Sequence, residues 1–165
     1  LRARLELAQP TRAEVTAFGE SAWRLLTTGM GELIADLHDQ GHAVWIVSGA
    51  ARELLLPLAA RLGVPDDRVR GVEFLWGDDG TLIDLAAENP ILEGKWRALE
   101  GLSETWERPR FAVGDGITDW ELREHGCVDT FIAFTEHVRR DAVLERCDRS
   151  AASVAELRAL LEETC

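Results

Sequence analysis

One stretch of sequence decides the fold: Phe111-Ala112-Val113-Gly114-Asp115-Gly116-Ile117-Thr118-Asp119. Its first three residues form a short apolar run that predicts a strand buried on both faces, as in a parallel sheet. The two glycines allow the backbone to turn sharply and to approach a ligand closely. A helix is expected to follow over about residues 118–125. Because ligands of open α/β sheets bind at the carboxyl ends of the strands, the polar residues of this stretch are the first candidates for a site.

The rest of the chain repeats this alternation of apolar strand and helix. Residues 43–47 and 131–134 are further apolar runs of strand length, and residues 72–76 and 81–83 predict a hairpin. Thr11 and Glu14 have the spacing of a capping box that opens a helix. Helices are expected over about residues 1–9, 12–19, 30–40, 51–62 and 153–163, and from Lys95 onward with Trp96, Leu99 and Leu102 in the core. The pattern predicts an α/β fold with a parallel sheet.

Composition excludes several classes of function. The chain has 165 residues, which fits one domain of ordinary size, and 18 basic residues face 30 acidic ones for a net charge of −12. This balance argues against nucleic-acid partners and against an anionic membrane surface, since both need clustered Lys and Arg. No apolar run approaches the ~20 residues of a membrane span. Three widely separated cysteines indicate reduced thiols in a cytoplasmic protein.

Three polar clusters stand at the ends of the expected strands or at helix starts. Ser48-Gly49 follows the strand at 43–47, where a hydroxyl and free N–H groups can bind an anion, although a serine there is also an ordinary helix N-cap. Lys95 opens a helix against the helix dipole, although most single lysines are solvated surface groups. Asp115 and Asp119 repel each other unless a cation lies with them, and oxygen ligands suit Mg²⁺. For these two the alternative is a simple Asp-Gly turn. A hydroxyl, a lysine and a carboxylate pair that converged on one point would meet the needs of phosphoryl transfer.

The order of these clusters resembles three motifs of the haloacid dehalogenase superfamily: Val-Ser-Gly, a helix-opening Lys, and Gly-Asp-Gly-x-Thr-Asp. The resemblance extends over most of the chain and is greatest to its phosphoserine phosphatase branch. Residues 7–12 resemble the end of that branch's helical cap, and residues 26–29 resemble a Leu-Thr-Pro-Gly segment with Thr28 in place of the proline. The resemblance implies a Rossmann-like three-layer core over 26–165 with a small hairpin insertion near 72–84, and the C-terminal part of a cap over 1–25.

The resemblance also implies roles for single residues. Ser48, aided by the Gly49 amide, would bind a phosphoryl oxygen, and Lys95 would neutralise charge on the phosphoryl group and the nucleophile. Asp115 would be the Mg²⁺ ligand, and Asp119 would orient a metal-bound water or Lys95. The two remaining site candidates are Thr118, as a donor to the phosphate, and Arg140, as a residue that holds the site or the substrate.

The family's first motif, an Asp-x-Asp-x-Thr run after an apolar strand, is absent from residues 1–165. Its first Asp is the nucleophile and its second the general acid and base. Near matches at 36–39 and 78–79 have the wrong spacing or lie in an expected turn. In the family this strand lies in the middle of the sheet, and each buried backbone group left without its partner costs about 1–3 kcal/mol. We therefore expect a segment of roughly 40–70 residues upstream of Leu1 that supplies the first core strand.

The leading hypothesis is a Mg²⁺-dependent phosphomonoesterase that acts on a small phosphorylated metabolite, with O-phosphoserine the best single substrate and serine biosynthesis the setting. A phosphotransferase to a small alcohol is a sibling possibility. The runner-up is a catalytically inactive homologue that binds a ligand or partner. A nucleotide-binding or receiver-like module is disfavoured, because the chain has no phosphate loop of the G-x-x-x-x-G-K type. The unpaired sheet that this chain would expose makes a homodimer plausible.

Overall fold

The computed structural model describes residues 2–163, and within them the chain falls into two compact units. One unit is formed by residues up to Leu26 together with Ile34–Leu92, and the other by Thr27–Leu33 together with residues from Glu93 onward. The expected division into a cap remnant over 1–25 and a core over 26–165 stays a prediction. None of the helices in the described part is long and apolar enough to cross a membrane.

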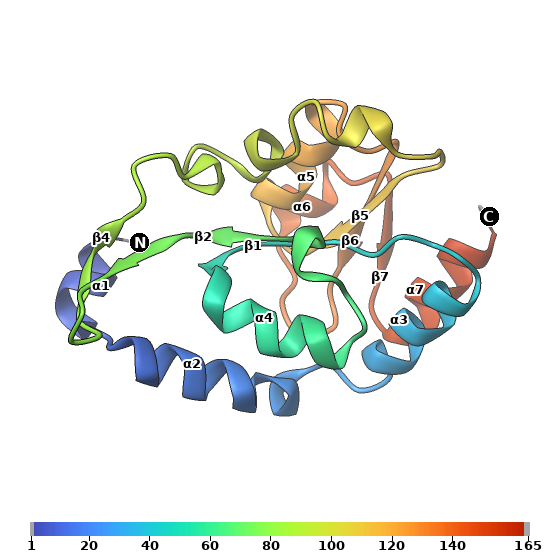
Figure 1. Ribbon diagram of the computed structural model, residues 1–165. Helices are drawn as coiled ribbons and strands as arrows, with labels where there is room; N and C mark the ends of the chain where they lie inside the picture. Colours follow the sequence, from blue (N-terminus) through green and yellow to red (C-terminus); the bar gives the residue numbers. More distant parts are fainter. Residues whose placement is uncertain (1, 164–165) are drawn as a thin grey trace. The chain divides into compact units, whose positions relative to one another are not determined.

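The first unit contains two small sheets and the helices beside them (Figure 1). Strand β1 (Ile46–Ala51) pairs in parallel with β2 (Val69–Val72), and β3 (Phe74–Trp76) forms an antiparallel hairpin with β4 (Leu82–Leu85). The helices are α1 (Arg2–Ala8), α2 (Arg12–Ser21), the short 3-10 helices η1 (Ala22–Leu25), η2 (Asp66–Arg68) and η3 (Pro90–Leu92), and α4 (Arg52–Arg61), which lies along α2. Helix α3 (Met30–Asp39) has its first turn in the second unit. The predicted hairpin and the Thr11–Glu14 capping box are both confirmed.

Strand β1 differs from its prediction in position and in burial. It begins at Ile46 rather than at residue 43, and it contains Ser48 and Gly49 instead of ending before them. Its residues are mostly half-buried, so the expected burial on both faces is wrong. Among the described residues β1 has a ladder only to β2, which leaves its other edge without a partner strand.

A bulge in β1 explains why the sequence pattern misplaced its end. Val47 pairs with Arg70 and Ala51 pairs with Val72, so residues 48–50 lie opposite Gly71 alone. A Cβ on Gly71 would lie 2.8 Å from Arg52 Cα, and for this reason only glycine lets the start of α4 approach β2 so closely. The apolar run at 43–47 indicated that a strand is present, but it could not show that this strand continues through a bulge to Ala51.

The second unit is built on a parallel sheet with the order β5-β6-β7 (Figure 1). Its strands are β5 (Phe111–Gly114), β6 (Thr130–Phe134) and β7 (Arg149–Ala151), and its helices are α5 (Ile117–Glu124), α6 (Asp141–Leu144) and α7 (Val154–Glu162). The central strand β6 is the best buried, with Phe131 and Ile132 fully inaccessible. With parallel strands and helices in both units, the α/β class is confirmed. The strands expected at 111–113 and 131–134 and the helices expected at 118–125 and 153–163 lie within a residue or two of their predicted bounds, whereas α6 and β7 were not predicted. Val113 is 40% exposed, so the expected burial of β5 on both faces is wrong.

A buried arginine secures the start of β5. Arg110 donates hydrogen bonds to the carbonyls of Ser103 and Gly126 and to the carboxylate of Asp129, which also accepts from the Arg110 backbone N–H. Burial lowers the pKa of Arg110 from its ordinary value, although the guanidinium keeps its charge beside Asp129. These bonds fix the strand that carries Gly114 and Asp115 at its other end.

A helix begins at Lys95 as expected, but it is a 3-10 helix that ends at Leu99, before the expected core residue Leu102. Two separate 3-10 turns stand there, η4 (Lys95–Leu99) and η5 (Ser103–Thr105), and Gly101 between them has a φ of 72°. A residue in this left-handed conformation ends a helix, and glycine adopts it without strain. Of the three expected core residues, Leu99 is buried, whereas Trp96 and Leu102 are only partly covered.

Cys127 is expected to resist thiol reagents in the folded protein. Its side chain is buried, its Sγ lies 3.8 Å from the Trp96 carbonyl oxygen, and burial raises the pKa of the thiol, so little thiolate is present at neutral pH. Alkylation with iodoacetamide, followed residue by residue by mass spectrometry, should modify the half-buried Cys147 before Cys127. Equal rates for the two residues in the native protein would contradict this expectation.

Candidate active site

The site forms around a pair of opposite charges at the carboxyl end of β5. Lys95 Nζ lies 2.5 Å from Asp119 Oδ1, and the two side chains are only 18% and 12% exposed. Lys95 comes from the start of η4 and Asp119 from the first turn of α5, 24 residues apart in sequence. The second carboxylate oxygen, Oδ2, accepts the Gly116 N–H at 3.1 Å. The structure therefore brings together two of the predicted site residues.

The glycines of Gly114-Asp115-Gly116 make room for this carboxylate. A Cβ on Gly114 would lie 2.3 Å from Asp119 Cγ, and one on Gly116 would lie 3.1 Å from Asp119 Oδ2. Gly116 has an ordinary extended backbone with φ of −115°, so it is not needed for a special backbone conformation. Steric room for Asp119, rather than the sharp turn that we expected, explains both glycines.

The other carboxylate of the motif has its own cation. Asp115 Oδ2 forms an ion pair with Arg140, which also donates to the Asp115 backbone carbonyl at 2.8 Å. Arg140 is the residue that precedes α6, in the loop after β6. Both side chains are about half exposed, at 47% for Asp115 and 49% for Arg140. The loop after β6 thus reaches the strand end that carries the motif.

Thr118 and the Ser48-Gly49 pair complete the list of predicted site residues. Thr118 is exposed in the first turn of α5, next to Asp119. Ser48 belongs to the first unit, where its Oγ accepts the Ala50 N–H at 3.1 Å within the β1 bulge. A Cβ on Gly49 would meet no described atom within 4 Å. The convergence of Ser48 and Gly49 with the Lys95 and Asp115 side stays a prediction.

These contacts change the argument about charge repulsion. Asp115 and Asp119 were expected to need a cation beside them, and each carboxylate is balanced by a side-chain cation, Arg140 and Lys95 respectively. In the described part of the chain, no group of three His, Cys, Asp or Glu side chains converges as a metal cage would require. A Mg²⁺ ion held by one of these carboxylates would therefore have to complete its coordination with other ligands, such as water or a substrate phosphate.

An aromatic stack that the sequence did not reveal supports Lys95. The ring of Trp96 stacks on His125 at 3.9 Å with an interplanar angle of 9°, and the Arg97 guanidinium lies 4.2 Å from the Trp96 ring centre. Gly94 has a φ of 148°, and a Cβ there would lie 2.7 Å from Trp96 Nε1. The stack holds the turn from which Lys95 reaches Asp119. No sequence spacing signals it, because the two rings come from separate elements.

Comparison with known proteins identifies the family to which this chain belongs. Residues 2–124 match the family model of haloacid dehalogenase-like hydrolases. The chain is 29% identical over 151 residues to the chloroplastic phosphoserine phosphatase of Arabidopsis thaliana, covering 90% of this chain and 51% of that protein. It is also 29% identical over 166 residues to phosphoserine phosphatase of Bos taurus, covering 99% of this chain and 73% of that protein. This chain thus spans about half the length of the plant relative.

A solved structure agrees with these matches. The crystal structure of a phosphoserine phosphohydrolase-like protein from Francisella tularensis is 34% identical and superimposes with a TM-score of 0.89, covering 96% of this chain and 74% of that one. The family match extends through Lys95 and the whole Gly114–Asp119 stretch, which are the elements that hold the ion pair described above. The chain therefore belongs to the haloacid dehalogenase-like hydrolase family.

Proposed function

We propose that this protein is a Mg²⁺-dependent phosphomonoesterase that acts on a small phosphorylated metabolite through an aspartyl-phosphate intermediate. The observation that carries the proposal is the nearly buried Lys95–Asp119 pair beside Asp115 at the carboxyl end of β5, in a chain of this hydrolase family. A lysine held in a site with little solvent can neutralise phosphoryl charge far better than one in water, because the local dielectric constant is lower.

The contacts support a division of roles among the residues. Asp119 holds the ammonium of Lys95 in one orientation, so that its remaining N–H groups can donate to an incoming phosphate. Arg140 lies against Asp115 and could exchange this partner for a phosphoryl oxygen. Thr118 offers an exposed hydroxyl in the first turn of α5. Ser48 and the Gly49 amide are proposed as further phosphate donors.

Asp115 is the residue proposed to hold Mg²⁺. Its carboxylate is a hard oxygen donor and is about half exposed, and Mg²⁺ is commonly held by one or two carboxylates together with substrate phosphate and water. The residues present fit such a site, provided that the cation shares or displaces Arg140. Bound Mg²⁺ would supply electrostatic stabilisation of the charge that develops on the phosphoryl group.

The attacking carboxylate is proposed to lie upstream of Leu1. Residues 1–165 contain no Asp-x-Asp run, and aspartyl-phosphate chemistry requires such a nucleophile. The carboxylate oxygen would attack phosphorus and release the alcohol, and water would then cleave the acyl phosphate to return the free carboxylate and inorganic phosphate. The unpartnered edge of β1 among the described residues is consistent with a further parallel strand in the complete protein.

O-phosphoserine is the proposed substrate, which would set the enzyme in serine biosynthesis in the cytoplasm. Two relatives at 29% identity carry the name phosphoserine phosphatase, and the Francisella tularensis protein is described as phosphoserine phosphohydrolase-like. Assembly as a homodimer stays a proposal. The alternative, an inactive homologue that binds a ligand or partner, is favoured by one observation, the absence of the Asp-x-Asp run from residues 1–165.

Asp115→Asn in the full-length gene product tests the proposal. Wild-type protein is expected to release phosphate from O-phosphoserine only when Mg²⁺ is present, and the variant to lose about a hundredfold or more in kcat/KM, since a metal supplies several kcal/mol to the transition state. Asp141→Asn removes the same charge from a side chain that is 89% exposed and serves as the control.

Three other results would decide against parts of this assignment. Hydrolysis that persists undiminished in EDTA would remove Asp115 from its proposed role as the metal ligand. Hydrolysis of other phosphomonoesters with O-phosphoserine left intact would reject only the substrate. No hydrolysis of any phosphomonoester by the full-length wild type would favour the inactive homologue.

A further inference from the structure

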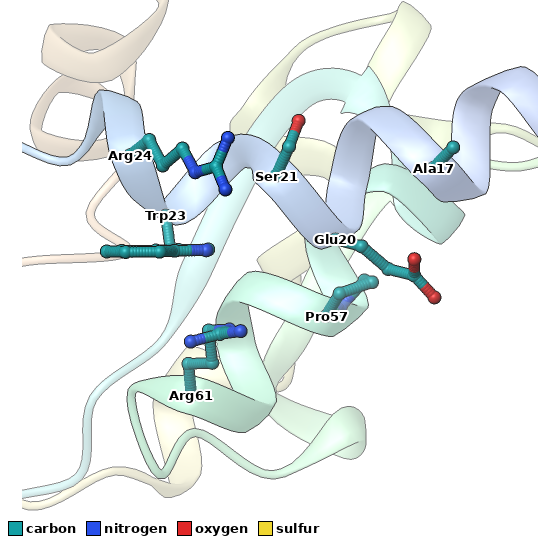
Figure 2. A pocket seen from close by; sticks show the side chains of 7 residues that line it. All are labelled: Ala17, Glu20, Ser21, Trp23, Arg24, Pro57 and Arg61. Atoms are coloured by element: carbon teal, nitrogen blue, oxygen red, sulfur yellow. The ribbon is translucent and has the colours of Figure 1, made fainter.

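A hollow in the first unit lies apart from every residue assigned above. It has a volume of about 580 Å³ and opens between α2, η1 and α4. Its lining, shown in Figure 2, consists of Ala17, Glu20, Ser21, Trp23, Arg24, Pro57 and Arg61. The volume falls within the ~300–1,000 Å³ of small-molecule sites, and the lining combines an aromatic ring with charged groups, as such sites do.

Two arginines flank one exposed tryptophan in this hollow. The guanidinium of Arg61 lies 4.9 Å from the Trp23 ring centre and that of Arg24 lies 5.7 Å from it, while Trp23 is 43% exposed. In Figure 2 the two guanidinium groups lie on opposite faces of the indole, whose nitrogen is at the end of the ring between them. Cation–π attraction holds both groups in place and leaves their N–H donors free to face outward.

Both arginines lack an acidic partner in the described residues. Three other arginines of this unit are paired, Arg2 with Asp84, Arg12 with Glu53 and Arg52 with Glu73, but no carboxylate oxygen of residues 2–163 lies within 4.0 Å of the Arg24 or Arg61 nitrogens. The acidic residue of the lining, Glu20, extends away from both guanidinium groups (Figure 2). In a chain with net charge −12, this hollow thus holds two neighbouring arginines without an ion-pair partner among the described residues.

One small molecule can reach both cations. The separation of their central carbons cannot exceed the sum of the two distances to the ring centre, and a molecule with two anionic groups a few bonds apart can span such a distance. The indole N–H of Trp23 lies between them along the same edge. Three hydrogen-bond donors, two of them charged, therefore face one side of the hollow, and the chemistry that matches them is a set of oxyanion oxygens.

We propose that this hollow binds small molecules that carry two oxyanion groups, with Arg24 and Arg61 each holding one group and the Trp23 N–H donating between them. Because the Trp23 ring lies between the two guanidinium groups, a single oxyanion that pairs with one of them leaves the other uncompensated. A compound with two linked groups satisfies both, and its second contact forms without a further loss of translational freedom. The site is independent of the proposed hydrolytic function, because it uses none of the same residues.

Isothermal titration of the full-length protein in EDTA tests the proposal, with succinate and pyrophosphate as probes and acetate and inorganic phosphate as comparisons. Succinate, pyrophosphate or both are expected to bind at least tenfold more tightly than the matching single-group anion, and the result shows whether carboxylate or phosphate is preferred. Arg24→Gln and Arg61→Gln should each weaken this binding about tenfold, and Trp23→Phe, which keeps a ring but removes the N–H, should weaken it severalfold.

Arg4→Gln is the matched control, since it removes the same charge from an exposed position on α1 of the same unit. The affinity of Arg4→Gln for succinate and pyrophosphate should equal that of the wild type. A loss in Arg4→Gln as large as in Arg61→Gln would mean only general attraction between charges, and the proposal would fall. It would fall equally if the two-group anions bound no better than acetate and phosphate, or if none of the probes bound at millimolar concentration.

Discussion

Asp119→Ala is expected to lower the free energy of unfolding by about 3–5 kcal/mol, because it leaves the ammonium of Lys95 nearly buried without its partner. The substitution also removes the acceptor of the Gly116 N–H, so the start of α5 loses a hydrogen bond as well. Hydrolysis by the full-length protein should fall below detection, since Lys95 would no longer be held in place for a phosphate. Urea unfolding and a phosphate-release assay measure the two effects.

A double-mutant cycle separates the charge pair from other consequences of losing Asp119. Lys95→Met alone should also destabilise, but Lys95→Met combined with Asp119→Ala should cost clearly less than the two single changes added together, because no unpaired charge remains. Asp141→Ala, at a side chain that is 89% exposed, gives the baseline. If Asp119→Ala costs no more than this baseline, the pair has no structural role.

Gly114→Ala is expected to disrupt the same pair from the backbone side. The added methyl group would lie 2.3 Å from Asp119 Cγ, so either the carboxylate leaves Lys95 or the end of β5 moves. Overpacking of this kind costs about 1–3 kcal/mol, and hydrolysis should fall with it because the lysine loses its fixed orientation. The measurements are again urea unfolding and phosphate release.

Two other glycines turn this prediction into a graded series. Gly116→Ala should have a smaller effect, because its methyl group would lie 3.1 Å from Asp119 Oδ2 and a small shift relieves the contact. Gly49→Ala, whose Cβ would meet no described atom within 4 Å, should leave the stability almost unchanged. An order of destabilisation other than Gly114, then Gly116, then Gly49 would contradict the steric explanation.

Most of the strands and helices could be predicted from local pattern alone, and the exceptions share a physical cause. Phe131–Phe134 is a central strand, so its apolar run is continuous and was identified directly. Strand β2 contains Arg70 and Gly71, and β7 begins at Arg149; both are short and carry polar residues, so no apolar run marks them. The helix expected from Lys95 was predicted too long for the opposite reason. Its apolar spacing through Leu102 is helical, but the 3-10 helix ends at Leu99, and Gly101 follows with a left-handed backbone conformation.

The residues of the candidate site could be predicted from the sequence, but the ion pairs that they form could not. The sequence placed Lys95, Asp115 and Asp119 at strand ends and helix starts, and the structure brings Lys95 to Asp119 across 24 residues. It did not predict that Arg140 would pair with Asp115, because Arg140 lies in a loop whose path depends on the packing of β6 and α6. Repulsion between the two carboxylates was inferred from their spacing, together with the need for a cation beside them. The spacing could not show that Arg140 and Lys95 are the side-chain cations that lie there, because it carries no information about groups from elsewhere in the chain.

The Arg140–Asp115 and Lys95–Asp119 pairs have a consequence for how folding relates to ligand binding. Each carboxylate carries a counterion supplied by the protein itself, so the strand end is electrically neutral before any ligand arrives. Domains whose acidic clusters depend on a metal unfold when the metal is withdrawn, because binding energy and folding energy are then the same quantity. In this protein the chain itself supplies the cations that balance both carboxylates, so this balance does not depend on a metal. The metal and phosphate of the proposed function would bind by exchange with these side-chain ions.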